Sequence, residues 1–407
     1  MLLDSGKMKY LCKEYGDAFY ILDSEQFRMN YNELINAFRS IYPKFNIAYS
    51  YKTNYTPELC KIVNQMGGYA EVVSDMEVEI AQRIGVSPSK IIWNGPYKNA
   101  EKMKELLLVG GTVNIDSAYE FDIVRNIASA YPEKVLNIGI RCNFEINDGV
   151  LSRFGLDVNS KEFQEALELV EKIPNLQLFG LQCHFASRKL DTWKNRTEGM
   201  LKILDKYNIV PKHLDLGGGL FGKMPDSLKK QFDSEIPTYQ DYANESASVI
   251  KQHYAHLDDS KKPMLLLEPG SALVGDCMSF VSRVINIKQV RGKSIATLLG
   301  SIYNINPTLN KKNPPITVFH MGGEEKQYED LDFGGFTCIE SDYIYKHFTG
   351  ELALGDMVLF GNAGSYSVVL KPPFILPNFP VIDICEDNIK VIKRKEYFDD
   401  IFHTFAF

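Results

Sequence analysis

The feature that most restricts the fold is a regular alternation of short apolar runs with segments of helical periodicity. The helical segments include DMEVEIAQRIG, AYEFDIVRNIASAY and KEFQEALELVEKI. The apolar runs have the length of buried strands, and eight occur before Gly275: FNIAYSY, GYAEVV, KIIWNG, GTVNID, VLNIGIRCN, LFGLQCHF, HLDLGG and PMLLLEPG. Eight strands with intervening helices predict a (β/α)8 barrel over residues 31–275. A doubly wound open sheet is the alternative, which the count of eight makes less favoured.

The sequence pattern changes after Gly275, where short strand-like runs follow one another without long helical segments between them. These runs are MSFVSRVINIKQV, SIATLLG, PITVFHM, MVLF and VIDICE. They predict a second, all-β domain over residues 276–407. Near the start of the chain, DAFYILD (17–23) predicts a strand before any helix. We expect residues 1–30, with this strand near Tyr20, to join the β domain.

Composition excludes several classes of function. A length of 407 residues favours two domains, and the formal charge of −7 disfavours nucleic acid or an anionic membrane as a partner. The first residues lack the apolar core and cleavage site of a secretory signal, and no apolar run has the length of a membrane span. Seven dispersed cysteines without a CxxC pair predict free thiols in a reducing cytoplasm and no metal site.

Lys52 stands where the first barrel strand ends, in YSYKTN. An ammonium at the end of a buried strand is costly unless it is paired or its pKa is lowered. A lysine of lowered pKa is the group that forms Schiff bases with carbonyl cofactors. A solvated lysine at a strand end is the alternative, so Lys52 alone does not decide the function.

Three consecutive glycines, Gly217 to Gly219, follow the seventh strand. Glycines at such a position let backbone N–H groups approach an anion closely, as in phosphate sites at loop-to-helix junctions. LEPG places Glu268 and Gly270 at the end of the neighbouring eighth strand. Because the loops after strands seven and eight commonly hold phosphate in barrels, these segments predict a phosphate site.

Three further polar residues lie on or at the ends of barrel strands and are expected at its active face: Glu71, Arg141 and His184. Glu71 is a buried-strand carboxylate that needs a cationic partner, which Lys52 would supply. His184 is placed to stack its imidazole on a flat aromatic ring. Each also has a structural explanation: an exposed strand end, a surface arginine and a hydrogen-bonded core histidine.

Taken in order, the strings YSYKTN, LDLGGGLFG, LEPGS, CIESD and NAGSYS resemble the fold-type III pyridoxal-phosphate decarboxylases, the family of diaminopimelate and ornithine decarboxylases. The resemblance covers nearly the whole chain. It implies an alanine-racemase-like barrel, a C-terminal β domain, pyridoxal 5'-phosphate as cofactor, and a homodimer whose subunits share active sites.

The resemblance also implies roles for single residues. Lys52 would hold the cofactor as an internal aldimine, Glu71 and Glu77 would lie near it, and His184 would stack on the pyridine ring. Glu268 would face the pyridine nitrogen, and Cys338 would return a proton to the carbanion. Further residues are implied in binding cofactor or substrate: Arg141, Ser187, Gly217, Gly218, Gly219, Gly270 and Tyr366 for the cofactor, and Cys338, Glu340 and Asp342 for the substrate.

Two departures from the family pattern concern the substrate. Ser271 follows EPG, where the family usually has an arginine that contacts phosphate or a substrate carboxylate. Ile339 follows the cysteine, where diaminopimelate enzymes tend to have glutamate, and Glu340 is displaced by one position. These departures predict a specialised substrate.

We therefore expect a pyridoxal-phosphate enzyme that removes the α-carboxylate of an amino acid or amino-acid conjugate in a siderophore or secondary-metabolite pathway. The alternatives are a diaminopimelate decarboxylase of lysine biosynthesis and a racemase or epimerase of the same fold type. Glu268 disfavours a racemase, because racemases of this fold place an arginine at the pyridine nitrogen. A non-catalytic binding protein is also disfavoured, since a decayed site has no need to keep Lys52, Cys338 and the phosphate loops.

Overall fold

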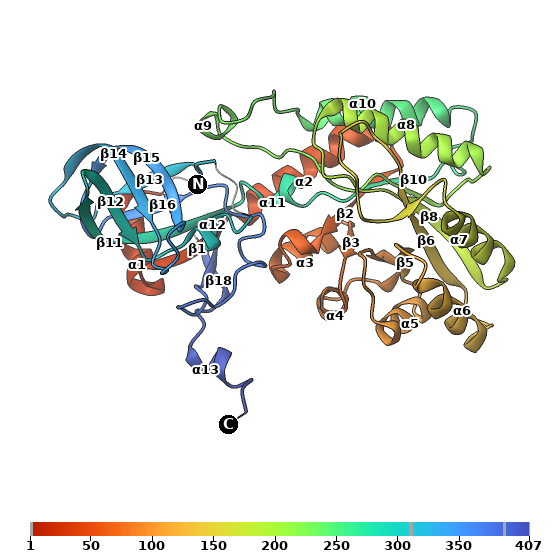
Figure 1. The fold of residues 1–407 in the computed structure, drawn as a ribbon, viewed down its shortest axis with the longest axis horizontal. Helices are drawn as coiled ribbons and strands as arrows, with labels where there is room; N and C mark the ends of the chain where they lie inside the picture. Colours follow the sequence, from red (N-terminus) through yellow and green to blue (C-terminus); the bar gives the residue numbers. More distant parts are fainter. Residues whose placement is uncertain (1–2, 309–311, 386–387, 407) are drawn as a thin grey trace. The chain divides into compact units, whose positions relative to one another are not determined.

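The computed structural model describes residues 3–308, 312–385 and 388–406, which form two compact units (Figure 1). The barrel unit comprises Asn30–Phe221 and Pro237–Ala272, and the β unit comprises Met1–Met29, Gly222–Ile236 and Leu273–Phe407. Within the described residues, no helix is both long and apolar enough to cross a membrane.

Eight parallel strands close into a barrel, as the alternation predicted. In chain order they are β2 (Phe45–Ser50), β3 (Tyr69–Val72), β4 (Ile91–Trp93), β5 (Thr112–Ile115), β6 (Leu136–Asn143), β8 (Leu176–Gln182), β9 (His213–Asp215) and β10 (Met264–Leu267). Pairing runs β5-β4-β3-β2-β10-β9-β8-β6, and β5 pairs with β6 to close the ring. The two-residue strand β7 (Leu156–Asp157) adds to β6. Sequence periodicity thus predicted the fold correctly, because buried parallel strands are continuous apolar runs.

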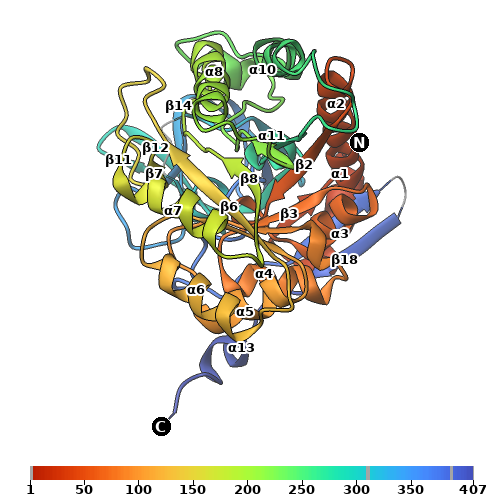
Figure 2. The same ribbon diagram turned by 90° about the vertical axis from the view of Figure 1, so that its right-hand side faces the viewer.

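Helices lie outside the strands (Figure 2). They are α2 (Ser24–Arg39), α3 (Pro57–Gln65), α4 (Asp75–Arg83), α5 (Ala100–Leu108), α6 (Glu120–Ala130), α7 (Lys161–Lys172), α8 (Leu190–Lys206) and α10 (Tyr239–His253), with short α11 (Ser271–Val274) after β10 and 3₁₀ turns η1 (Tyr51–Thr53) and η2 (Pro88–Lys90). In α7, Ser160 caps the first turn by accepting from the Phe163 N–H, and Phe163, Ala166 and Val170 form the buried face.

The β unit is built on a mixed sheet with the path β15-β14-β12-β11-β1-β17-β18, to which β16 and β13 are attached through β11. Its strands are β1 (Ala18–Leu22), β11 (Met278–Val290), β12 (Lys293–Leu298), β13 (Ile316–Phe319), β14 (Lys326–Gly334), β15 (Tyr343–Leu352), β16 (Met357–Phe360), β17 (Val381–Cys385) and β18 (Asn388–Lys393). Three short helices belong to it: α9 (Asp226–Lys229), α12 (Ile302–Ile305) and α13 (Phe398–Phe402).

Of the two expectations for the start of the chain, one is confirmed and one is wrong. Strand β1 pairs with β11 and β17, which confirms that the strand near Tyr20 joins the β domain. The expectation of no helix before it is wrong, because α1 (Ser5–Tyr15) precedes β1. Asp4 caps this helix, and Met8, Leu11 and Cys12 form a narrow buried face. Three apolar residues among charged ones are a weak helical signal.

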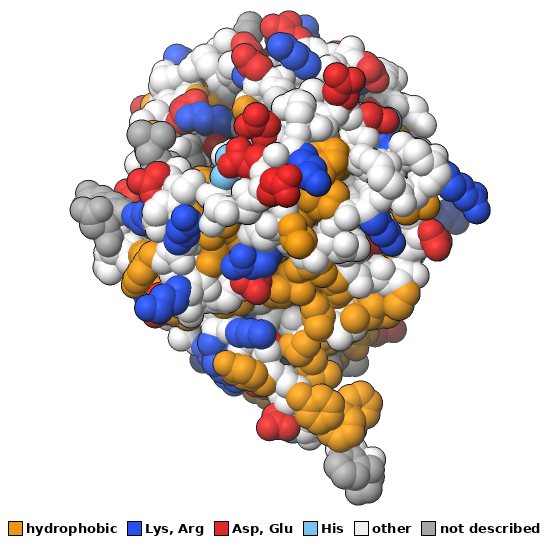
Figure 3. All heavy atoms as spheres, turned by 90° about the vertical axis from the view of Figure 1, so that its left-hand side faces the viewer, with side chains coloured by type: hydrophobic (Ala, Val, Ile, Leu, Met, Phe, Trp, Pro, Cys, Tyr) orange, Lys and Arg blue, Asp and Glu red, His pale blue; other side chains and the backbone are white. Residues whose placement is uncertain are grey.

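Large exposed apolar side chains are concentrated near the C-terminus. Figure 3 shows apolar side chains gathered over part of one face and continuing toward the end of the chain. The large exposed apolar residues of this C-terminal segment are Leu370, Phe374, Ile375, Val391, Tyr397, Phe398, Phe402 and Phe405. Apolar areas of this kind commonly mark surfaces that bind another protein.

Candidate active site

Lys52 forms an ion pair with a fully buried glutamate at the C-terminal end of the barrel. It lies in η1, directly after β2, and its Nζ is 2.5 Å from Oε2 of Glu71 on β3 and 2.9 Å from Oγ of Ser50. Ser50 also donates to Glu71. Burial alone would raise the pKa of Glu71, but the charge of Lys52 and the hydrogen bonds from Lys52, Ser50 and Asn94 outweigh burial and lower it. Glu71 is therefore ionised and holds Lys52 at the strand end.

Glu268 lies in a second buried polar group within the same barrel. It follows β10, and its Oε1 accepts from Nδ2 of Asn94 at 2.5 Å and from Nε2 of Gln182 at 3.2 Å. Burial, together with the nearby Asp215 and Glu71 carboxylates, raises the pKa of Glu268 well above its usual value. Glu268 therefore retains a proton much more strongly than an exposed glutamate does.

Asp215 stands at the end of β9 and links Glu268 to the glycine loop. Its Oδ1 accepts from the Gly217 N–H at 2.8 Å, and its carboxyl group shares a hydrogen bond with that of Glu268. Burial raises the pKa of Asp215 to about 7. Glu77, whose pKa burial also raises to about 7, accepts from the Val73 N–H at 2.7 Å.

These raised pKa values predict a stability that falls with pH in the protein without cofactor. A carboxyl whose pKa is higher in the folded than in the unfolded state stabilises the fold below its unfolded pKa of about 4, and this contribution is lost as pH rises through the folded value. For Asp215 the folded value is about 7. Each pKa unit corresponds to about 1.4 kcal/mol, so we expect a loss of a few kcal/mol between about pH 5 and pH 8.

Asp215→Asn should flatten this dependence, because asparagine can still accept from the Gly217 N–H but does not titrate. Urea unfolding at a series of pH values measures the slope. Asp233→Asn, at an exposed position of the β unit, is the control and should leave the slope unchanged. An Asp215→Asn protein with the slope of the unsubstituted protein would contradict the assignment.

His184 follows β8 and is held in one tautomer. Its Nδ1 accepts the Gly218 N–H at 2.9 Å, so the ring proton is on Nε2. Burial and the nearby cations Lys52, Arg141 and Arg196 lower the pKa of His184 well below its usual value. The 3.9 Å separation between Nδ1 and Glu268 Oε2 is therefore not an ion pair. His184 offers a neutral, flat ring.

The glycine loop after β9 has no room for side chains. A Cβ at Gly217 would lie 2.3 Å from the Cys183 carbonyl oxygen, and one at Gly218 would lie 2.5 Å from the Glu268 carbonyl oxygen. Gly217 and Gly219 have φ values of 70° and 86°, which favour glycine. The loop therefore packs backbone against backbone. Its Gly217 and Gly218 N–H groups are used within the protein, by Asp215 and His184.

Arg196 on α8 holds this loop and the loop after β8 together. Its side chain is fully buried and donates to the carbonyl oxygens of Leu216 at 3.0 Å, Gly218 at 2.6 Å and Phe185 at 3.0 Å. A longer bond of 3.4 Å reaches the carbonyl of Ser187, whose hydroxyl accepts from Thr192. Arg196 thus fixes the shape of both loops.

Two further expected residues lie at the same end of the barrel. Gly270 passes so close to Thr53 that a Cβ would lie 2.0 Å from Thr53 Oγ1. Arg141 on β6 is buried, and its Nη1 is 3.1 Å from Oδ1 of Asp116, which follows β5. Its Nε has no hydrogen-bond partner among the described residues. Asp116 therefore orients Arg141 and leaves part of the guanidinium available.

The remaining expected residues belong to the β unit. Cys338 and Glu340 are exposed, whereas Asp342 is buried. Asp342 Oδ1 accepts from Ser301 Oγ and the Ile302 N–H, and its Oδ2 accepts from Thr337 Oγ1 at 2.6 Å. The Asp342 carboxylate is thus used to hold the Cys338 loop onto α12.

Tyr366 lies in a tightly wound segment. Tyr366 and Asn362 have φ values of 64° and 56°, unusual for residues with side chains. Gly364 approaches Val274 so closely that a Cβ would lie 1.8 Å from its carbonyl oxygen. Backbone strain of this kind is concentrated at functional sites.

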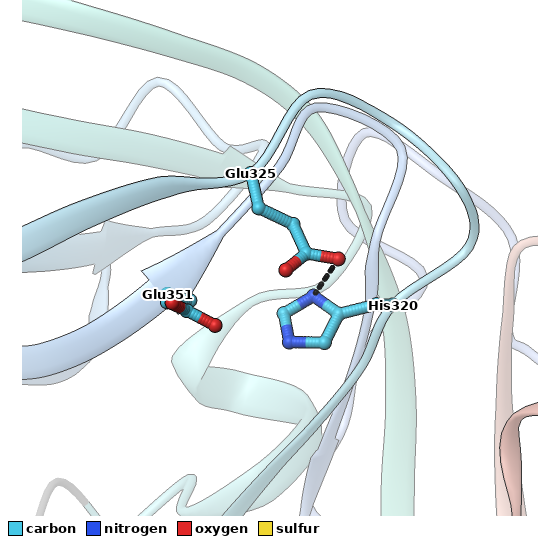
Figure 4. A group of neighbouring side chains, drawn as sticks. All are labelled: His320, Glu325 and Glu351. Carbon is cyan, nitrogen blue, oxygen red and sulfur yellow. Dashed lines mark ion pairs between the residues drawn. The ribbon is translucent and has the colours of Figure 1, made fainter.

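A histidine and two glutamates face one another on the β unit, with their ligand atoms within 4.8 Å (Figure 4). The buried Asp356 lies 2.9 Å from Nδ1 of His320 and accepts the N–H groups of Met321 and Ala353. Glu325 and Glu351 are exposed. Asp356 and His320 join two loops of the β unit, which gives the histidine a structural role.

Several polar residues of the barrel site were not predicted from the sequence. Gln182 carries a usable signal, because it precedes His184 by two positions and therefore shares its strand face. Asp215, Asp116 and Asn94 each stand at or directly after a barrel strand, where polar residues face the active end. Arg196 lies within a helix and has no such signal.

Comparison with known proteins gives consistent matches. Residues 29–275 match the family model described as the pyridoxal binding domain of pyridoxal-dependent decarboxylases. The diaminopimelate decarboxylase of Aquifex aeolicus is 24% identical, covering 98% of this chain and 94% of its own length. That of Methanocaldococcus jannaschii is also 24% identical, covering 96% and 91%.

Solved structures share the fold. A crystal structure of diaminopimelate decarboxylase from M. jannaschii superposes with a TM-score of 0.86 at 22% identity, covering 98% of this chain and 94% of that one. Lysine decarboxylase from Selenomonas ruminantium superposes with a TM-score of 0.75 at 23% identity, covering 95% and 97%.

Proposed function

The chain belongs to the pyridoxal-dependent decarboxylases, whose pyridoxal-binding domain matches residues 29–275, and from this premise we propose that it decarboxylates diaminopimelate. Membership makes the protein a carboxy-lyase that acts on an amino acid and uses pyridoxal phosphate. The observation that carries the proposed substrate is the match to diaminopimelate decarboxylases over nearly the whole chain. The relatives favour this substrate over a siderophore-type conjugate.

The barrel residues fit the cofactor. A lysine paired with Glu71 stands at one strand end, and a glycine loop with no room for side chains stands at another. Glu268 is a buried carboxyl with a second buried carboxyl, Asp215, close by. Lys52 would hold the cofactor covalently, the glycine loop would hold its phosphate, and Glu268 would face its ring nitrogen.

Bound pyridoxal phosphate supplies an electron sink that stabilises negative charge at Cα when the carboxylate leaves as CO2. Glu71 holds the Lys52 amine beside Ser50, and its negative charge lies near the proton on the Lys52 nitrogen. Glu268 would face the ring nitrogen, and its raised pKa means that a proton is held at this end of the site, where the ring nitrogen would share it. His184 contributes a neutral ring face, because the Gly218 N–H occupies its Nδ1.

Cys338 would return a proton to Cα. It is the one exposed cysteine, since Cys385 is half-buried and the other five are buried. We propose a homodimer in which Cys338 and Glu340 of one subunit complete the barrel site of the other. The exposed apolar side chains between Leu370 and Phe405 support burial against a second copy of the chain.

Diaminopimelate carries a second carboxylate, for which Ser271 offers no charge. Two arginines in loops after barrel strands are available instead. Arg153 and Arg188 each lie over a phenylalanine ring, and neither forms an ion pair with a carboxylate of the described residues. Either arginine would supply a cation for the second carboxylate in place of the arginine that usually follows EPG.

CO2 release from a panel of amino acids tests the substrate. The panel contains meso-diaminopimelate, lysine, ornithine and amino-acid conjugates. We expect release from diaminopimelate at a rate ordinary for enzymes, about 1–1000 per second, and little from lysine, which lacks the second carboxylate. Release from lysine, ornithine or a conjugate alone would contradict the proposed substrate, and chiral analysis showing racemisation without CO2 would contradict decarboxylation.

A further inference from the structure

A single side-chain nitrogen joins the two carboxylates of the barrel site. Nδ2 of Asn94, which directly follows β4, lies 3.0 Å from Oε1 of Glu71 and 2.5 Å from Oε1 of Glu268. An amide nitrogen carries two hydrogens, so Asn94 donates one to each carboxylate. All three side chains are buried, so bulk water has little access to these bonds.

The orientation of the Asn94 amide is fixed by a second asparagine. Asn114 on β5 donates from Nδ2 to Oδ1 of Asn94 at 2.7 Å, which places the Asn94 nitrogen toward the carboxylates. Asn114 occupies space left by Gly139 on β6, where a Cβ would lie 1.7 Å from Asn114 Oδ1. The bridge is thus supported by two further strands and cannot rotate without losing the bond from Asn114.

The carboxylates of Glu71 and Glu268 have different partners. Glu71 is paired with Lys52, and Glu268 is bonded to Gln182. Glu71 contributes to raising the pKa of Glu268, so the two groups repel each other through the barrel interior. A donor between them lowers this repulsion, and a side chain of the same shape without hydrogens to give would increase it.

We propose that Asn94 is a positioning residue that holds both carboxylates of the cofactor site in place and couples the lysine end to the ring-nitrogen end. Removing it would take one hydrogen bond from Glu71 and one from Glu268 at the same time. The inference rests on pyridoxal phosphate binding and on no particular substrate. Its failure is therefore distinguishable from failure on the amino-acid panel.

Three variants separate hydrogen bonding from shape. Asn94→Asp keeps the shape but brings a third carboxyl and loses the donors, whereas Asn94→Ala loses both shape and donors. Thr112→Val is the matched control, because Thr112 lies on the Asn114 face of β5 and its buried hydroxyl has no partner among the described residues.

The readout is the pH titration of the absorbance of the bound cofactor, which reports the proton on the Lys52 nitrogen. A hydrogen bond to a charged group contributes about one to two pKa units. We expect Asn94→Ala to raise the titration midpoint by about one unit, because Glu71 without its donor holds that proton more strongly, and Asn94→Asp to raise it further. Thr112→Val should leave it unchanged.

An Asn94→Asp protein that titrates like the unsubstituted protein would show that only shape matters and would overturn the proposal. If Asn94→Asp does not fold, Asn114→Ala provides a second test, because it frees the Asn94 amide while keeping Asn94. We expect a smaller upward shift for Asn114→Ala than for Asn94→Ala, and no shift in either would also overturn the proposal.

Discussion

Replacing Lys52 with alanine should lower CO2 release by about 1000-fold or more, because the amine that would hold the cofactor is lost while the rest of the site remains. Glu71, Ser50 and the glycine loop are positioned by their own strands and by Arg196, so the variant is expected to fold. CO2 release and cofactor absorbance, measured on the purified variant, check this expectation.

Lys52→Arg is the matched control. It keeps a positive charge beside Glu71 but cannot attach the cofactor, since a guanidinium does not lose its proton in this pH range. We expect it to be as inactive as Lys52→Ala. A small added primary amine should restore part of the activity of Lys52→Ala only, because alanine leaves space beside Glu71. Activity of Lys52→Arg near that of the unsubstituted protein would exclude Lys52 as the attachment site.

The Lys52→Ala variant also tests whether residues of both subunits form each active site. If Cys338 of one subunit serves the barrel of the other, mixing Lys52→Ala with Cys338→Ala produces mixed dimers with one intact site. Random exchange should then restore about a quarter of the activity from two inactive proteins. Activity that stays at the level of the separate variants after exchange would show that each chain serves its own site.

The sequence predicts the barrel well because its strands are buried on both sides and continuous in the chain. It also predicts positions such as Lys52, His184 and Glu268, since the end of a barrel strand is a local feature that faces the active end. Strands β14 and β15 escaped prediction because charged and polar residues, as in KQYEDLDFG, interrupt their apolar pattern. These segments are strands because they pair, β14 with β12 and β15 with β14, and the apolar pattern of one segment does not contain such pairing.

The supporting contacts of the site could not be predicted for a related reason. Asn94 becomes a bridge only when β10 brings Glu268 opposite β3 and β4, 174 residues away in sequence. Asp342 has the sequence context of a substrate ligand, but the fold places α12 and Thr337 around it and uses both oxygens. Whether a polar residue contacts substrate or supports the loop beside it depends on contacts that periodicity does not contain.

Arg196 is the clearest case of such a support. It lies on a helix whose pattern predicts only a buried face, and its guanidinium donates to carbonyl oxygens at the ends of two different barrel strands. It also lies 4.3 Å over the Trp193 ring, whose Nε1 donates to the Gly219 carbonyl. Burial lowers the pKa of Arg196 to about 10, so it remains charged near neutral pH. The charge therefore lies behind the loop that would hold the phosphate.

Arg196→Lys should lower both stability and cofactor affinity although it keeps the charge. One ammonium has three donors on a single atom and cannot reach both loops as the planar guanidinium does. Since each buried carbonyl left without a donor costs about 1–3 kcal/mol, we expect a loss of about 3 kcal/mol in urea unfolding and at least tenfold weaker binding of pyridoxal phosphate. Arg125→Lys on α6, an exposed residue with one ion pair to Asp122, is the control and should change neither. Loss of stability with unchanged cofactor affinity would show that Arg196 supports the fold but not cofactor binding. Loss of both would show that the shape of the glycine loop depends on Arg196, a residue behind the loop.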